Sequence, residues 1–369
     1  MKIGIITFWW SNDNYGQLLQ CYALQRYLKN LGHEPFLIRY KCTDDILPCK
    51  NFEKLRLSYI CTYFRNRLSS LLKKQTRKYT NRHFDEFRQM YINYSDRIYR
   101  SFDELKSSNI DVDMLIVGSD QVWNNWNYPL YRFKNRIHAC FLDFASEKTK
   151  RLSYSASWGI TDLTDEYIAE ITPLLKKFDY VSVREKSGIN LCKQCGCDDA
   201  EWVCDPTLLL SADDYRKIYN GVNFYKRENK YLFLYILNNN CKFNYQIISN
   251  FARKKHLDIV YITGNRMNDK YTKIEASIPE WLYLLDNAEY VITNSFHCGV
   301  FSTIFHKKFG IVPLEGNLSQ ANSRIDSLFE LRGIGNRYIK DNDFSILDQE
   351  YYINDINISK KFKSFFCNN

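Results

Sequence analysis

Short apolar runs alternate with amphipathic stretches along most of the chain. Residues 2–8 are apolar, the polar sequence SNDNYG follows, and Leu24, Leu28 and Leu31 then recur at spacings of four and three. This pattern predicts a strand, a loop and an amphipathic helix. Glycine readily takes the left-handed conformation that closes a helix, so the helix is predicted to end at Leu31 and Gly32, before a second strand in HEPFLIRY. The chain therefore opens with a β-α-β unit.

The same rhythm continues through the rest of the sequence. Further strands are predicted at 113–117, 152–156, 180–183, 231–237, 259–263, 290–293 and 309–312. Helical stretches separate them, and such alternation is typical of α/β domains with parallel sheets. We predict two α/β domains: 1–180, with a basic helical insertion at about 51–110, and 181–369, which includes a C-terminal tail.

Four polar loops follow predicted strands: SNDNYG, GSDQ, REKSG and NSFHCG. In parallel α/β sheets, ligands bind at the carboxyl ends of the strands, where such loops lie. The four loops therefore predict one cleft between the two domains. No G-x-G-x-x-G pattern accompanies the first helix, which argues against a dinucleotide cofactor.

Composition narrows the class of protein. The twelve cysteines are scattered through 369 residues rather than concentrated in a small framework, which favours reduced thiols in a cytosol. The first ten residues lack the features of a signal peptide, and no apolar run approaches the roughly 20 residues needed to cross a bilayer. We expect a cytoplasmic protein.

The net charge of +9 comes mostly from one segment. Residues 51–100 hold twelve Lys and Arg against four Asp and Glu. A solvated helical face is the commoner meaning of such a segment, and attraction to anionic lipid or nucleic acid is the alternative, of which we keep membrane proximity.

Five segments occur in an order typical of one family. They are NYGQLLQCYALQRYLKNLG, MLIVGSDQVWN, YVSVREKSG, VCDPTLLL and VITNSFHCGVFSTIFHKKFG. Together they resemble the polysaccharide pyruvyl transferase family over roughly residues 3–337. The resemblance implies two Rossmann-like domains facing a cleft (GT-B-like), a phosphoenolpyruvate donor, a sugar acceptor and a role in bacterial capsular or exopolysaccharide biosynthesis. It implies no separate cofactor and no nucleic-acid partner.

The chemistry implied by this resemblance needs cations, an acid and a base. Forming a ketal from phosphoenolpyruvate requires protonation of its methylene carbon, attack by a sugar hydroxyl, loss of phosphate and closure by a second hydroxyl. Arginine suits phosphate and carboxylate because it donates in a planar fork. Arg184, directly after a predicted strand, is the first candidate for binding the donor, with Lys186 and Arg324 as secondary cations. A plain salt bridge with neighbouring carboxylates is the alternative for Arg184.

Ser295 is a departure from the family pattern. Many members carry an arginine two residues before the histidine of the TNSFHCG-like segment, whereas this chain has serine there. Another cation is then expected to bind the donor's phosphate or carboxylate, or the branch uses a different donor. We therefore keep Ser295 among the substrate-binding candidates.

Two residues are predicted to be catalytic. His297 should lie near the start of an apolar helix and face the cleft, where it can donate to an anion or carry a proton. Asp120 leaves a buried strand in the other domain and could activate a sugar hydroxyl, with Ser119 and Gln121 beside it. The alternatives are a core histidine for His297 and a turn-capping residue for Asp120.

The opening of the first helix supplies further candidates. Asn14, Tyr15 and Gly16 lie where free N–H groups could meet an anion or a sugar oxygen, although an Asn before a helix is commonly an ordinary N-cap. Asp205 precedes a proline and is predicted to shape a turn, or to orient a residue of the cleft.

Cysteines 192, 195, 197 and 204 include one C-x-x-C, which is ligand-like, but a second such pair is missing. Incidental thiols are the preferred interpretation, and no metal site is predicted.

Other functions remain open at this point. The same architecture hosts glycosyltransferases that use nucleotide sugars, and a non-catalytic carbohydrate-binding homologue is a further alternative. A lipid-diphosphate-linked oligosaccharide is the hypothetical acceptor, which would bring the protein to the inner leaflet of the cytoplasmic membrane and use the charge of 51–100.

Overall fold

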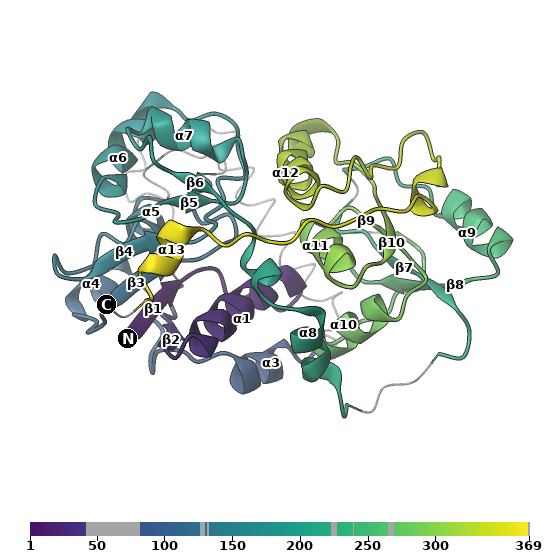
Figure 1. Ribbon diagram of the computed structural model, residues 1–369, viewed down its shortest axis with the longest axis horizontal. Helices are drawn as coiled ribbons and strands as arrows, with labels where there is room; N and C mark the ends of the chain where they lie inside the picture. The colour runs from purple at the N-terminus through teal and green to yellow at the C-terminus, as the bar shows by residue number, and fades with distance from the viewer. Residues whose placement is uncertain are drawn as a thin grey trace, which may run out of the picture.

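The computed structural model describes residues 1–41, 82–125, 130, 133–222, 227–238, 240–264 and 269–367. Its described strands form two four-stranded parallel sheets and a two-stranded parallel pair, with helices around them, which confirms the predicted α/β class (Figure 1). Of the basic insertion expected at about 51–110, the part up to residue 81 lies outside the described residues. None of the helices described here is both long and apolar enough to cross a membrane.

The first sheet has the strand order β2-β1-β3-β4. Its strands are β1 (Lys2–Ile6), β2 (Glu34–Leu37), β3 (Met114–Val117) and β4 (Lys150–Ser153). The surrounding helices are α1 (Tyr15–Asn30), α3 (Phe84–Tyr91), α4 (Phe102–Ser107), α5 (Lys134–Cys140), α6 (Asp165–Leu175) and α7 (Gly188–Gln194). β1 and β3 are almost wholly buried, as expected of strands in a parallel sheet covered on both faces.

The second sheet has the order β10-β9-β7-β8. It consists of β7 (Tyr231–Tyr235), β8 (Asp258–Ile262), β9 (Tyr290–Thr293) and β10 (Lys308–Ile311). Its α-helices are α8 (Ala212–Tyr219), α9 (Tyr245–Lys254), α10 (Ile278–Asp286), α11 (Phe296–Ile304) and α12 (Ser323–Arg332), and 3-10 turns lie at η4 (Pro206–Leu209), η5 (Gly316–Asn322) and η6 (Ser345–Leu347). Two parallel sheets, each flanked by helices, give the Rossmann-like, GT-B-like architecture.

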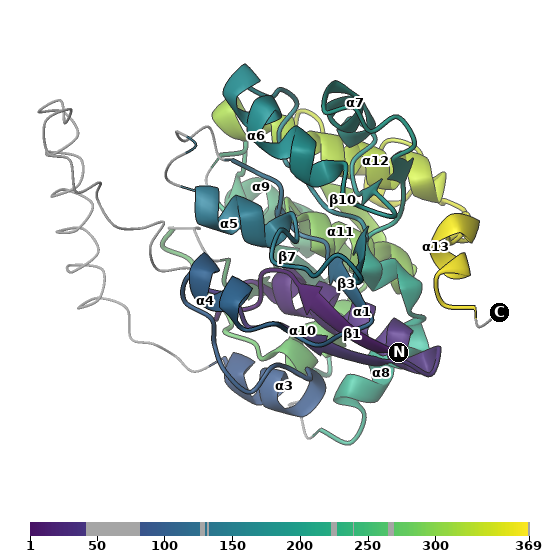
Figure 2. The same cartoon turned by 90° about the vertical axis from the view of Figure 1, so that its left-hand side faces the viewer.

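The division expected near residue 180 falls inside the first group of strands. β5 (Ser182–Val183) pairs in parallel with β6 (Glu201–Trp202), and parallel bridges join Leu152 to Tyr180 and Ala156 to Val183. Figures 1 and 2 show α6 and α7 at this end of the first sheet and α3 at the other. Residues 181–202 therefore continue the first sheet, because their backbone pairs with the segment that follows β4.

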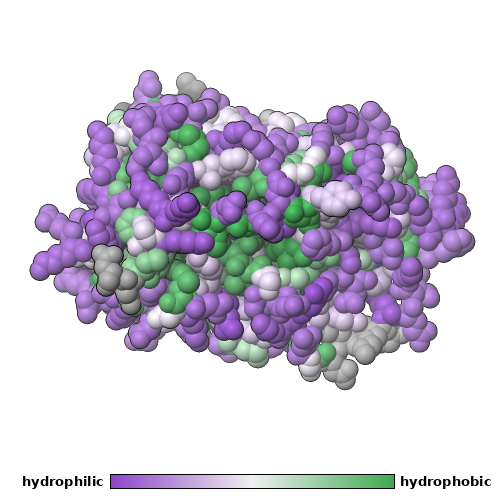
Figure 3. Space-filling model, viewed as in Figure 1, coloured by the Kyte–Doolittle hydropathy of each residue, from purple (hydrophilic) through white to green (hydrophobic). Residues whose placement is uncertain are grey.

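The C-terminal tail also returns to the first sheet. Its helix α13 (Lys360–Ser364) places Phe362 against Tyr154 and Tyr180, with ring centroids 4.5 and 5.7 Å apart. Figure 1 shows the tail crossing from the second sheet to the first, so that both chain ends lie at the first sheet. Hydrophobic residues gather in the middle of the same face, along this crossing (Figure 3).

The first turn of α1 joins the two halves. Tyr15 is buried, its ring stacks on Trp281 at 5.1 Å, and its hydroxyl donates to the Ala276 carbonyl oxygen at 2.7 Å. One hydrophobic cluster includes side chains of α1 as well as those of α10 and α11. The amino end of α1 is therefore fixed against the second sheet's helices, beside the carboxyl ends of the strands.

Candidate active site

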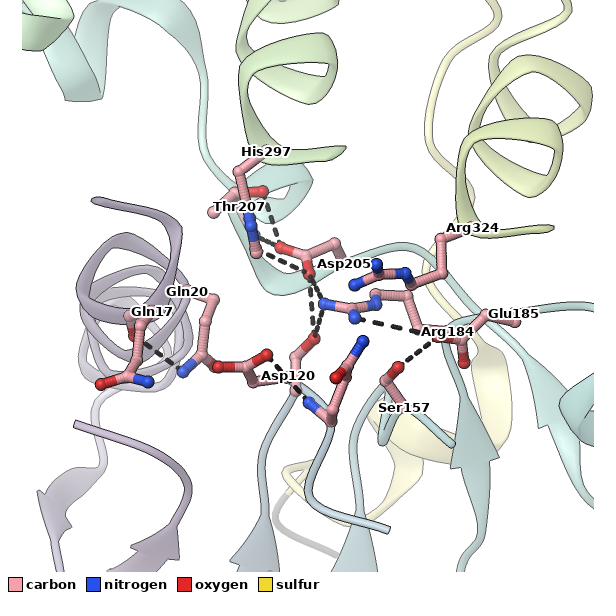
Figure 4. A network of polar contacts seen from close by, with 12 residues as sticks. Gln17, Gln20, Asp120, Ser157, Arg184, Glu185, Asp205, Thr207, His297 and Arg324 are labelled. Carbon is pink, nitrogen blue, oxygen red and sulfur yellow. Dashed lines mark hydrogen bonds and ion pairs between the residues drawn. The ribbon is translucent and has the colours of Figure 1, made fainter. Parts of the chain in front are cut away.

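A buried carboxylate, Asp205, lies at the centre of a polar network between the two sheets (Figure 4). Its Oδ1 caps the η4 turn by accepting from the backbone N–H and the hydroxyl of Thr207, at 3.0 and 2.7 Å. Its Oδ2 accepts from Ser119 Oγ at 2.9 Å and from Arg184 Nη1 at 3.2 Å. Each oxygen therefore has at least two donors, as a stable buried carboxylate requires.

The ionic state of Asp205 follows from these neighbours. Burial alone would raise the pKa of this carboxyl, but the charges of His297 and Arg184 and the N–H of Thr207 hold the pKa well below its usual range. Asp205 therefore stays negative at neutral pH. Its role is to anchor the cationic groups around it.

His297 approaches Asp205 from the second sheet. β9 ends at Thr293, Ser295 caps α11 by accepting from the Cys298 N–H at 3.3 Å, and His297 lies in the first turn of that helix. His297 Nε2 is 3.6 Å from Asp205 Oδ2, within ion-pair range but beyond a good hydrogen bond. The expected position, near a helix start and between the halves, is thus observed.

Gly16 makes room for this imidazole. A Cβ atom at Gly16 would lie only 2.1 Å from His297 Nδ1 and 2.3 Å from His297 Cγ. Glycine therefore allows the first turn of α1 to approach the His297 ring directly. The two helix starts meet at this point.

Arg184 follows β5 and is 3% exposed. Its guanidinium lies 4.7 Å above the Phe296 ring, and Nη1 donates to Ser119 Oγ and Asp205 Oδ2. Nε and Nη2 have no hydrogen-bond partner among the described residues, although Nη2 is 3.8 Å from Glu185 Oε1. Two buried donors of a cation are therefore left for a ligand to satisfy.

Arg324, in the first turn of α12, is the second cation of the site. It is partly buried, and Figure 4 shows its guanidinium pointing toward Arg184. Burial and the charge of Arg184 lower the pKa of Arg324 to about 10. No carboxylate forms an ion pair with it within the described ranges. Two like charges held together in this way form a site for an anion.

The predicted substrate-binding residues divide into two groups. Ser119 and Gly16 join Arg184, Arg324 and His297 in the network described above. Asp120 is partly exposed at the carboxyl end of β3, and its charge acts on the pKa of Arg324, so it lies near the cation pair.

The other candidates make contacts outside this network. Lys186 forms an exposed ion pair with Glu330. Asn14 Oδ1 accepts from the Gln17 N–H at 3.2 Å and so caps α1. Tyr15 packs between the halves, and the Gln121 side chain lies beside Gly159. Their observed contacts are capping, packing and surface pairing.

Taken together, the geometry can bind an anion and move a proton. The arginine pair supplies the cationic donors, and His297, 3.6 Å from Asp205, is a side chain that could carry a proton. In the described parts of the chain, no group of three or more His, Cys, Asp or Glu side chains could hold a metal ion. Cys192, Cys195 and Cys204 are buried free thiols.

A family model named "Polysaccharide pyruvyl transferase" matches residues 14–314, most of the chain. The chain belongs to the polysaccharide pyruvyl transferase family. This family member is accordingly a transferase enzyme. The match covers both sheets apart from β1, and every residue of the network except Arg324. No curated protein sequence matches it.

Solved structures with some likeness to this family member are distant. The UDP-GlcNAc 2-epimerase from Methanocaldococcus jannaschii has a TM-score of 0.47 at 12% identity, covering 96% of this chain and 95% of that chain. The Neisseria meningitidis UDP-GlcNAc 2-epimerase, bound to UDP-GlcNAc, has a TM-score of 0.44 at 10% identity, covering 90% and 91%. An alpha-glucosyltransferase in complex with UDP and DNA has a TM-score of 0.46 at 10% identity, covering 94% and 88%. Likenesses this weak carry no functional conclusion.

Asp205, Thr207, Glu185 and Ser157 belong to the network and were not predicted as site residues. Asp205 was interpreted mainly as a turn residue, and Glu185 and Ser157 were not singled out. Glu185 is 1% exposed, and its Oε1 accepts from Ser157 Oγ. A carboxylate directly after Arg184, at the end of a buried strand, was the signal available in the sequence.

Proposed function

We propose that this family member transfers the enolpyruvyl group of phosphoenolpyruvate to a pair of sugar hydroxyls and forms a cyclic ketal. The observation that carries the proposal is the arginine pair. Arg184 keeps two buried N–H donors unpaired, and Arg324 has no ion-pair partner among the described residues. His297 and Arg184 face the same oxygen of Asp205. Phosphoenolpyruvate carries a phosphate and a carboxylate on a small frame, so it suits two convergent guanidinium groups.

The proposed reaction balances with two hydroxyls and one donor. The donor's methylene carbon gains a proton, and a first sugar oxygen bonds to the neighbouring carbon. The C–O bond to phosphate breaks, and the second sugar oxygen closes the ketal. The two hydroxyl protons end on the methyl group and on the released phosphate. His297, held by Asp205, is proposed to carry a proton in this sequence, and the arginine pair to stabilise the leaving phosphate.

Ser295 bears on how the donor is bound. Many relatives have arginine at this position, whereas Ser295 Oγ here accepts from the Cys298 N–H and caps α11. The positive charge that serine lacks is proposed to come from Arg324 of α12. This supports an unchanged donor with a rearranged set of cations.

The acceptor is proposed to lie on the side of the first sheet. Asp120 is partly exposed at the end of β3 and is proposed as the base for a sugar hydroxyl. A capsular or exopolysaccharide precursor carried on a lipid diphosphate, at the cytoplasmic side of the membrane, is the proposed acceptor. Lys73, Lys74, Arg77 and Lys78, which would meet the anionic leaflet, lie outside the described residues.

The donor can be tested by thermal unfolding with phosphoenolpyruvate and with a panel of nucleotide sugars. A ligand that binds only the folded protein raises the melting temperature. At a hundred times its Kd it adds about 2.7 kcal/mol to the free energy of unfolding. Arg324→Gln is the informative variant, because it leaves no ion-paired carboxylate behind. We expect phosphoenolpyruvate to stabilise the wild type clearly more than this variant. Stabilisation by a nucleotide sugar alone would replace the proposal with glycosyl transfer.

A further inference from the structure

Glu185 is a buried carboxylate whose hydrogen bonds are incomplete. It is 1% exposed and follows Arg184 at the end of β5. Oε1 accepts from Ser157 Oγ and lies 3.8 Å from Arg184 Nη2, but Oε2 has no partner among the described residues. A buried carboxylate oxygen without a donor is costly, so this group needs an explanation.

Asp205 on the opposite side of the same guanidinium differs in this respect (Figure 4). Both of its oxygens are fully bonded, and its pKa is held well below the usual range. Asp205 is therefore fixed as an anion, whereas Glu185 has one lone oxygen and one weak ion pair. Of the two buried carboxylates on Arg184, Glu185 is the one with an oxygen that accepts no hydrogen bond from the described residues.

The charges around the arginine pair explain why a proton would be taken up. Without a ligand, the cations Arg184 and Arg324 already share the site with the carboxylates Asp205 and Glu185. An anion bound to the arginine pair would share Arg184 Nη2 with Glu185 and add negative charge to a buried site. Like charges that share such a site cannot all stay ionised, so one group must bind a proton.

We propose that Glu185 takes up a proton when an anionic donor binds the arginine pair. The inference rests on the proposed donor site and adds the charge regulation of that site. The other charged groups near Glu185 either form ion pairs of their own or, being cations, disfavour protonation of Glu185. Arg324 on α12 is cationic, and Lys186 on the same loop is paired with Glu330. Asp120 after β3 is partly exposed, and His297 on α11 lies on the Asp205 side.

The test counts protons by isothermal titration calorimetry of phosphoenolpyruvate in buffers of different ionisation enthalpy. At about pH 8 a phosphate ester, whose second pKa is about 6, is already fully ionised. We expect the wild type to take up about one proton per bound anion, with affinity that weakens by up to about tenfold per pH unit. Glu185→Gln should bind with almost no uptake, because glutamine mimics the protonated acid.

Sulfate is titrated as a second anion, because it has no proton to exchange at this pH. If sulfate binds with proton uptake and phosphoenolpyruvate does not bind, the proposed role of Glu185 stands and the proposal that phosphoenolpyruvate is the donor is wrong. Glu330→Gln, which removes the nearby exposed carboxylate, should keep the uptake.

Three results would overturn the inference: equal uptake by Glu185→Gln and wild type, no uptake by the wild type, or no binding of either anion. Loss of uptake only in His297→Gln would assign the proton to the imidazole and also overturn it. If Glu185→Gln does not fold, infrared difference spectra of the wild type decide the question. A protonated-carboxyl band must then appear when the anion binds.

Discussion

Replacing Gly16 with alanine should damage the contact between the two halves of the site. The added Cβ would lie 2.1 Å from His297 Nδ1, whereas ordinary contact begins at 3.4 Å. The imidazole must therefore retreat by about 1.3 Å, or the start of α1 must move away from α11. Both atoms belong to the His297 ring, which lies against Asp205, so either movement costs free energy.

The expected magnitude combines two opposing effects. Overpacking of a well-packed site typically costs about 1–3 kcal/mol. Alanine favours a helix over glycine by about 1 kcal/mol, which offsets part of this loss. We therefore expect Gly16→Ala to lower the free energy of unfolding by up to about 2 kcal/mol. A catalytic group displaced by about 1 Å can also lose about a hundredfold in rate.

Urea unfolding gives the free energy, and a second helical glycine gives the control. A Cβ at Gly299 in α11 would meet only the ends of the Ile311 and Leu328 side chains, at 3.2 and 3.6 Å. Gly299→Ala should therefore be close to neutral. Equal or higher stability of Gly16→Ala relative to Gly299→Ala would refute the reasoning that His297 fills the space beside Gly16.

Further predictions concern Asp205 and Ser295 at the site and Phe362 in the C-terminal tail. Asp205→Asn should lower the free energy of unfolding, measured in urea, by about 3–5 kcal/mol, because Arg184 would stay buried with only a weak ion pair. A decrease below about 1 kcal/mol would contradict this. Because the pKa of Asp205 is depressed in the fold, its contribution is complete above the unfolded value of about 3.9 and is lost as the pH falls toward the folded value. The difference in free energy of unfolding between wild type and Asp205→Asn should therefore become smaller below about pH 4 and stay constant above it. Ser295→Ala should cost about 1 kcal/mol of stability through the lost N-cap, and Ser295→Asp should restore most of it. Phe362→Ala should cost about 3–5 kcal/mol and expose the tail to limited proteolysis, and an unchanged cleavage pattern would contradict its anchoring role.

The hydrophobic pattern predicted the elements well because each of them is specified locally. The first helix ends as expected, with Asn30 as its last residue and Gly32 in a left-handed conformation at φ 84°. Each predicted strand coincides with an observed strand within a few residues. Apolar runs of this length specify buried parallel strands wherever they occur in the chain.

The boundary between the two halves could not be predicted in the same way. The pairing of β5 with β6 and the return of α13 to the first sheet depend on contacts between distant segments. Neither leaves a periodic signal in the sequence. As a result, Arg184 was assigned to the second domain, whereas the structure places it on the first sheet.

The site was only partly visible in the sequence for a related reason. His297, Arg184 and Ser119 were expected because polar loops at strand ends converge in parallel sheets. The importance of Asp205 depends on Ser119, 86 residues away along the chain, and on His297 in another loop. A residue that caps a turn and also anchors a network cannot be distinguished from an ordinary cap by its neighbours in sequence.

The affinity of phosphoenolpyruvate for Arg324→Gln tests the central claim most directly. Hydrogen bonds to charged groups are worth about 1.5–3 kcal/mol, so we expect Kd to rise by about ten- to a hundredfold relative to wild type. Lys186→Gln is the matched control, because Lys186 is paired with Glu330 at the surface and should bind the donor as the wild type does. Equal affinities of Arg324→Gln and wild type, or binding of a nucleotide sugar but not of phosphoenolpyruvate, would contradict the assignment of the arginine pair as the donor site.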